Sequence, residues 1–113
     1  MSDKIPLSVI VLTFNEEKNI RECLDSLVTW VDEVIIVDSF STDATLNIIS
    51  EYPGVQVHQH EFHNYSLQRN WAFENLPIRN AFVMNLDADH RVTPELKAEL
   101  IQHFTQGIPE HIH

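Results

Sequence analysis

Apolar and polar positions follow one another along the chain in blocks that predict four strands, each followed by a helix. Short apolar runs rich in β-branched residues predict strands that are buried on both faces. Apolar residues spaced three and four apart predict the helices between them. The expected strands are 7–12, 34–37, 55–57 and 81–86, and the expected helices run from about 15 to 30, 43 to 52, 66 to 75 and 93 to 107.

Capping residues set the expected ends of these helices. Asn15 is a suitable cap for the first helix, and two glutamates follow it where the helix dipole favours negative charge. Asp43 is expected to cap the second helix. Thr93 followed by Pro94 predicts the start of the fourth, and Gly107 predicts its end.

This alternation of strands and helices predicts an α/β fold of three layers. Parallel strands joined by right-handed crossovers place helices on both faces of one sheet, as in Rossmann-like folds. The chain has 113 residues, which is enough to bury a core without disulfides. Because no repeat, linker or low-complexity segment interrupts the pattern, we expect a single domain over residues 1–113.

Composition narrows the classes of partner and compartment. Seven Lys and Arg against 17 Asp and Glu give a net charge of −10, which disfavours binding to nucleic acid. A lone cysteine, Cys23, excludes an internal disulfide framework and is expected to pack on the apolar face of the first helix. No signal peptide and no run of about 18 apolar residues is present, so we expect a cytoplasmic protein. Peripheral contact with the inner face of the membrane stays open.

Three polar clusters follow three of the predicted strands. They occupy residues 13–16, 38–43 and 87–89. Ligands of open parallel sheets bind just outside the carboxyl ends of the strands. Each cluster alone would be ordinary loop chemistry, since Asn, Asp, Ser and Thr commonly cap helices and turns. Three clusters at one edge of the sheet favour a binding site.

The last cluster offers a divalent metal site. Gly54 and Gly107 are the only glycines, so neither a dinucleotide fingerprint nor a P-loop can form. A chain this acidic would repel a nucleotide diphosphate unless a cation lies between them. Asp87 and Asp89 could hold Mg²⁺ or Mn²⁺ together with substrate phosphates. The Asp-x-Asp pattern is weak by itself, and no glycine follows at the position that a calcium loop requires.

In order and spacing, three segments resemble family 2 glycosyltransferases, and among them the bacterial lipopolysaccharide-core glucosyltransferases. These are residues 8–20, residues 32–45, and residues 83–89 with 92–96. The resemblance covers nearly the whole chain and implies the GT-A fold of nucleotide-diphospho-sugar transferases. It implies inverting transfer from a nucleotide-sugar, a UDP-sugar by preference, to a hydroxyl of a glycan or lipid-linked acceptor in cell-envelope or lipopolysaccharide synthesis.

The resemblance also implies residue roles. Asp38 would contact the base, Arg69 would offset phosphate charge, and Asp87 would lie near the ribose. Asp89 would ligate the metal, which acts as a Lewis acid on the leaving nucleotide diphosphate. The full set implied around the nucleotide is Thr13, Asn15, Glu16, Asp38, Arg69, Asn70 and Asp87.

Two features depart from the family pattern. His90 stands where family members often carry an acidic residue. Family members are also longer, and their second half carries the acceptor site and the carboxylate that acts as general base. No base can be nominated here, because Glu110 lies in the tail. We therefore expect a truncated donor-binding half, with a module that binds nucleotide-sugar without transferring it as the alternative.

Other features have simpler interpretations. His58, His60 and His63 lack the fourth ligand of a zinc site, so we expect solvent-facing or loop histidines. Trp30 and Trp71 could stack on sugars, but core packing is the expectation for both. An interaction domain that resembles a response regulator would need a lysine on a later strand, and the pattern predicts no such strand.

Overall fold

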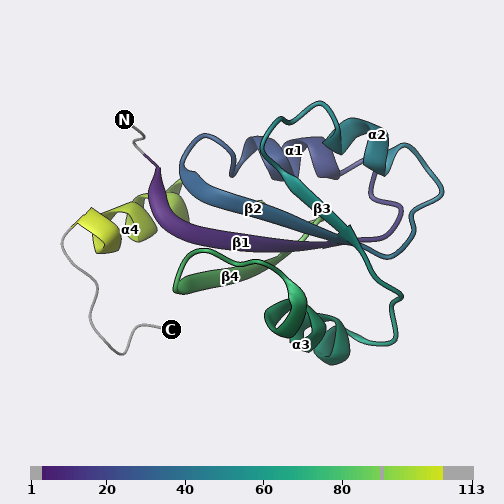
Figure 1. Ribbon diagram of the computed structural model, residues 1–113. Coiled ribbons are helices and arrows are strands. Elements are labelled where there is room, and N and C mark those ends of the chain that lie inside the picture. Colours follow the sequence, from purple (N-terminus) through teal and green to yellow (C-terminus); the bar gives the residue numbers. More distant parts are fainter. Residues whose placement is uncertain (1–3, 90, 106–113) are drawn as a thin grey trace.

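Four parallel strands alternate with four helices in the computed structural model, which describes residues 4–89 and 91–105 (Figure 1). His90, Gly107 and Glu110 lie outside the described residues, so the expectations for them stay untested. The elements are β1 (Ile5–Thr13), α1 (Ile20–Asp25), β2 (Val31–Asp38), α2 (Thr45–Ile49), β3 (Gln56–Gln59), α3 (Tyr65–Asn75), β4 (Phe82–Asp87) and α4 (Pro94–Thr105).

The sheet has the strand order β3-β2-β1-β4, with every neighbouring pair parallel. β1 lies in the centre, which explains its almost continuous apolar run. Its last residues pair with the ends of both neighbours, Leu12 with Asp87 and Thr13 with Asp38. The register therefore brings the three predicted polar clusters to one edge of the sheet.

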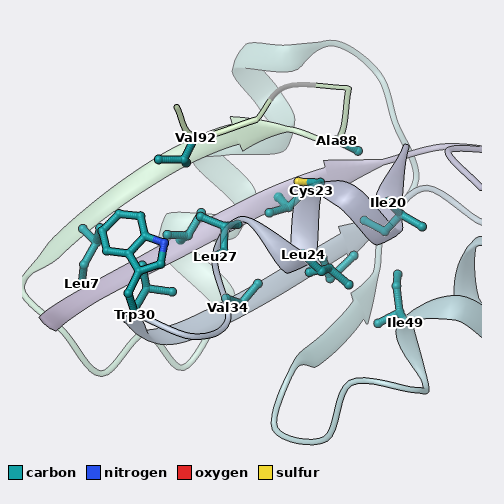
Figure 2. Close-up of a cluster of buried hydrophobic side chains, with 14 of the residues drawn as sticks. Leu7, Ile20, Cys23, Leu24, Leu27, Trp30, Val34, Ile49, Ala88 and Val92 are labelled. Atoms are coloured by element: carbon teal, nitrogen blue, oxygen red, sulfur yellow. The ribbon is translucent and has the colours of Figure 1, made fainter. Parts of the chain in front are cut away.

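Helices cover both faces of this sheet and confirm the three-layer prediction. α1 and α2 lie on one face and α3 lies on the other (Figure 1). The larger core fills the first face, and Figure 2 shows side chains of α1 lying against the strands. Cys23 and Trp30 are both buried there, as the sequence predicted. None of the described helices is long and apolar enough to cross a membrane.

The prediction of a first helix from Asn15 to about Trp30 is wrong. α1 covers only Ile20–Asp25, and its N-cap residue is Asn19, whose side chain makes no capping bond. Asn15 instead has a left-handed backbone with φ of 51°. Its N–H donates to the Ser41 hydroxyl at 2.8 Å, so its backbone is committed to another loop. Asn adopts this conformation more readily than most residues do.

Two further helices differ in detail from the sequence patterns. α3 buries Gln68 and Ala72, whereas Leu67, expected on its inner face, is 52% exposed. α2 ends at Ile49 and continues as turns. The start of α4 is confirmed, since the Thr93 hydroxyl accepts a hydrogen bond from the Leu96 N–H at 3.1 Å.

A buried carboxylate, that of Glu33, connects neighbouring strands on the α3 face of the sheet. It lies toward the end of the sheet opposite the predicted site. Glu33 is 4% exposed and accepts from the Ser8 hydroxyl at 2.8 Å and from the Gln56 amide at 3.1 Å. The backbone N–H of Arg79 donates to it as well, at 3.1 Å. These bonds link β1, β2, β3 and the segment before β4. They favour one register of the strands, because a slipped strand would leave polar groups unpaired.

Candidate functional site

A pocket of about 540 Å³ opens at the carboxyl ends of the strands. β1 contributes its last two residues, and the loop after each described strand contributes at least one side chain. The lining residues are Leu12, Thr13, Phe14, Glu16, Ser39, Phe40, Glu61, Phe62, Tyr65, Asp87 and Asp89. The pocket therefore lies at the edge that the polar clusters predicted.

The loops after β1 and β2 are fastened to each other beside this pocket. The side-chain oxygen of Asn15 accepts from the backbone N–H groups of Thr42 and Asp43, at 2.8 and 3.3 Å. The backbone N–H of Glu16 donates to the Thr45 hydroxyl at 2.8 Å. Asp43 caps α2 as predicted, since its carboxylate accepts from the Thr45 N–H at 2.9 Å. It does so from the position just before Ala44, the N-cap residue of α2.

Asp38 holds the second loop in shape. Its buried carboxylate accepts from the hydroxyl groups of Thr13 and Ser41, each at 2.6 Å. It also accepts from the Ser41 N–H at 2.8 Å and the Gln59 amide at 3.4 Å. Asp38 does not line the pocket. The structure thus shows Asp38 bonded to both loops, and its predicted contact with the base stays a prediction.

The turn after β4 presents two carboxylates to the pocket. Asp87 and Asp89 both line it, and the buried Ala88 lies between them. Arg91, which sequence reasoning missed, donates to the Ala88 carbonyl at 3.1 Å and to Glu22 of α1 at 3.2 Å. The guanidinium therefore fastens the Asp-Ala-Asp turn to the helix behind it.

Four large aromatic side chains surround the pocket, and sequence reasoning missed them. This aromatic rim consists of Phe14, Phe40, Phe62 and Tyr65, which are 45–58% exposed. Exposed aromatic side chains gathered at one opening are typical of a binding site. Phe14 and Phe40 stand inside two of the quoted polar clusters, a position that could have revealed them.

The pocket is acidic, which bears on its metal chemistry. Glu16 and Glu61 add two carboxylates to Asp87 and Asp89. Within residues 4–89 and 91–105, no three or more His, Cys, Asp or Glu side chains form a group that could hold a metal ion. Two aspartates at the end of a strand fit the mode in which one or two carboxylates share a divalent ion with substrate phosphates.

The remaining predicted residues lie on α3. Arg69 and Asn70 do not line the pocket. The Arg69 guanidinium lies over the ring of Tyr65, 5.6 Å from its centroid. Arg69 is thus one residue removed from the lining, whereas Asn70 is exposed.

Within the part of the chain that the structure describes, the histidines belong to no group that could hold a metal ion. His60 is partly buried and stacks on Trp71 with ring centroids 4.0 Å apart. His60 follows the last residue of β3 and is thus one of the loop histidines that the sequence predicted, although it is not simply solvent-facing. Trp71 packs against the smaller core, as predicted.

Known proteins support this reading of the fold. A family model described as glycosyl transferase family 2 matches residues 8–109. The lipopolysaccharide core biosynthesis glycosyltransferase LpsC of Rhizobium meliloti (strain 1021) is 31% identical over 101 residues, covering 86% of this chain and 36% of LpsC. The curated relatives are longer proteins, of which the chain spans 24–36%.

Solved structures show the same architecture. S. aureus TarS superposes with a TM-score of 0.72 and 31% identity, covering 94% of this chain and 33% of that one. Glucosyl-3-phosphoglycerate synthase from Mycobacterium tuberculosis, solved with Mn²⁺, UDP and glucosyl-3-phosphoglycerate, gives a TM-score of 0.59 at 24% identity and covers 86% of this chain and 40% of that one. The expected Rossmann-like fold of the GT-A type is confirmed.

Proposed function

Because the chain belongs to glycosyl transferase family 2, we propose that its pocket binds the nucleotide-sugar donor of an inverting glycosyltransferase. The observation that supports this proposal most directly is the pocket at the carboxyl ends of the strands, which is lined by Asp87, Asp89 and the aromatic rim. In the transfer, an acceptor hydroxyl oxygen bonds to the anomeric carbon while the bond to the diphosphate breaks. The diphosphate leaves with the electron pair, and the hydroxyl proton passes to a general base, for which no described residue is assigned.

We assign the nucleoside to the part of the pocket near the loops after β1 and β2. Nucleobases stack on aromatic faces, and Phe14 and Phe40 supply two such faces beside Thr13. Asp38 acts on this region through the loop that it holds, since its carboxylate already accepts bonds from Thr13 and Ser41. Asn15 acts in the same way on the opposite loop.

We assign the diphosphate to the side of the pocket formed by the turn after β4. Asp89, with Asp87, would hold Mg²⁺ or Mn²⁺ between the acidic wall and the phosphates. When bound, the ion supplies positive charge to the leaving diphosphate. The M. tuberculosis enzyme, which contains both Mn²⁺ and UDP, motivates UDP as the first nucleotide to test. Arg69, whose guanidinium lies over the ring of Tyr65, is the candidate to offset phosphate charge.

The proposed acceptor is a hydroxyl compound whose class is suggested by a relative. LpsC, whose name refers to lipopolysaccharide core biosynthesis, motivates a glycan or lipid-linked acceptor at the cytoplasmic face of the membrane. We assign no general base within the described residues. The alternative is a module that holds nucleotide-sugar without transferring it.

Calorimetric titration of UDP and UDP-glucose, with and without Mn²⁺, tests donor binding. Asp89→Asn is the informative variant, and Glu99→Gln removes one charge from the exposed face of α4 as a matched control. We expect binding that requires Mn²⁺, is lost in Asp89→Asn and persists in Glu99→Gln. Metal-independent binding, or equal loss in both variants, would contradict the assignment.

A transfer assay separates the two alternatives. The chain is incubated with radiolabelled UDP-glucose, Mn²⁺ and a panel of lipid and oligosaccharide acceptors. Labelled product that disappears in Asp89→Asn would exclude the binding-only alternative. Binding without any labelled product would support that alternative and leave the donor site in place.

A further inference from the structure

Gln68 is a long polar side chain that α3 buries almost completely, with 1% of its surface exposed. Its amide oxygen lies 2.7 Å from Nδ1 of His60, and its amide nitrogen donates to the Ser39 hydroxyl at 3.1 Å and to the His60 carbonyl at 3.3 Å. Burying an amide costs free energy unless it is hydrogen-bonded. Here all of these partners lie outside the helix that carries Gln68.

The two segments that Gln68 joins both contribute to the pocket lining. Ser39 and Phe40 line the pocket after β2. Glu61 and Phe62, which follow His60 directly, line it after β3. Gln68 itself does not line the pocket. One buried amide behind the lining is therefore bonded to both aromatic-bearing segments.

The first segment needs such support because of its backbone. Phe40 has a left-handed φ of 59°, a conformation that is unfavourable for a non-glycine residue and persists where neighbouring bonds fix it. The Ser39 N–H donates to the Thr13 carbonyl at 2.9 Å, and the Ser41 N–H donates to Asp38 at 2.8 Å. The Gln68 amide donates to the Ser39 hydroxyl as well.

The second segment is held at His60. Its backbone N–H donates to the Asp38 carbonyl at 3.0 Å, and its ring stacks on Trp71. Because an amide oxygen only accepts, the bond to Gln68 places the hydrogen of the neutral imidazole on Nδ1. The ring is thereby fixed by a stack on one side and by the buried amide on its edge.

We propose that Gln68 is a positioning residue that sets the spacing between the Ser39–Phe40 and Glu61–Phe62 segments, and so fixes where Phe40 stands in the part of the pocket assigned to the nucleobase. The identity of the ligand rests on the proposed function, whereas the coupling of the two segments does not. A planar ligand gains stacking energy on Phe40 only when the ring stands in the right place relative to the rest of the lining. A preorganised lining avoids the cost of ordering these side chains on binding.

The first test uses no ligand. Gln68→Met keeps the length and fills the buried space without hydrogen bonds, and Asn75→Leu removes an exposed amide of the same helix that donates to the Trp71 carbonyl. Hydrogen exchange is followed at the backbone amides of 39–41 and 60–62. We expect both segments to exchange faster together in Gln68→Met, with the amides of β1 and β2 unchanged, and no such effect in Asn75→Leu. Unchanged exchange, or faster exchange in one segment alone, would overturn the coupling.

The second test measures UDP affinity in the presence of Mn²⁺. Loss of hydrogen bonds of this kind should weaken binding about fivefold to tenfold in Gln68→Met. Ser39→Ala should do the same, and the double variant should be weaker than wild type by much less than the product of the two single losses. Unchanged affinity in Gln68→Met, or fully multiplicative losses, would refute the positioning role. A wild-type chain that does not bind UDP would instead contradict the proposed function, and the exchange experiment would still decide the coupling.

Discussion

Single residues at the pocket act mainly across loops rather than along their own helices. Asn15 bonds to Thr42 and Asp43, and Thr13 bonds to Asp38. Each of these partners stands more than 20 positions away in the sequence. A substitution in one loop therefore changes the shape of both, and its effect on binding need not come from contact with the ligand.

Asp43 gives this loop pair a dependence on pH. Burial would raise the pKa of its carboxyl, but hydrogen bonds from the Thr45 hydroxyl and from the backbone N–H groups of Thr45 and Glu17 outweigh burial and lower it. A carboxyl whose pKa is lowered by folding stabilises the folded state above its unfolded value of about 3.9, and this contribution is lost as the pH falls through the folded value. Asn at this position cannot titrate.

Urea unfolding of Asp43→Asn therefore has an expected pH profile. The free energy of unfolding should lie below that of the wild type at pH 7, and the difference should shrink as the pH drops below about 4. A difference that stays constant between pH 7 and pH 3 would show that the carboxylate charge makes no contribution. The measurement needs no ligand.

Phe14 tests the aromatic rim. It is 58% exposed beside the pocket, and Phe73 is 50% exposed on α3 outside the lining, so the two are matched in exposure. Stacking of one base on an aromatic side chain contributes about 1–3 kcal/mol. Phe14→Ala should weaken UDP binding accordingly, and Phe73→Ala should not. Equal affinities for the two variants would remove Phe14 from the site.

At the scale of elements, the sheet carries two different polar arrangements at its two ends. The carboxyl ends of the strands present their polar side chains to the pocket, whereas Glu33, near the other end, is enclosed by Ser8, Gln56 and Arg79. The first arrangement leaves polar groups for a ligand. The second satisfies them within the protein and so stabilises the order of the strands.

Removal of Glu33 should be costly. Glu33→Ala leaves the Ser8 hydroxyl, the Gln56 amide and the Arg79 N–H without their common acceptor, which should lower the free energy of unfolding by about 2–4 kcal/mol. Glu51→Ala is the control, because Glu51 forms an exposed pair with Arg21 and should leave stability close to that of the wild type. Similar urea midpoints for the two variants would contradict a stabilising network.

Sequence patterns predicted the elements well where packing decides them. The apolar runs of β1 and β2 give buried strands whatever their neighbours are, and the Thr93-Pro94 cap depends only on local bonds. The failures share a different cause. The helix expected after Asn15 is replaced by bonds to a loop 26 or more positions away, and the buried face of α3 is set by Gln68 reaching Ser39. Such partners are visible only once the strands are paired.

The whole molecule combines a net charge of −10 with a pocket that four carboxylates line. Such a surface repels the diphosphate of a nucleotide-sugar. A divalent ion at the turn after β4 would offset the charge of two of these carboxylates, so under the proposed function metal and nucleotide should each raise the affinity of the other. Under the proposed function, the polar edge of the sheet, the acidic pocket and the aromatic rim form one site for a nucleotide with its metal ion.

Paramagnetic broadening by Mn²⁺ in the NMR spectrum of the chain tests this account most directly. In the presence of UDP, substoichiometric Mn²⁺ should broaden the amide signals of 87–89 first, and then those of 13–16 and 39–40. Without UDP, the broadening should be much weaker. Broadening centred on other acidic surfaces, such as Glu95 and Glu99 of α4, or an identical pattern with and without UDP, would show that the pocket is not a metal–nucleotide site.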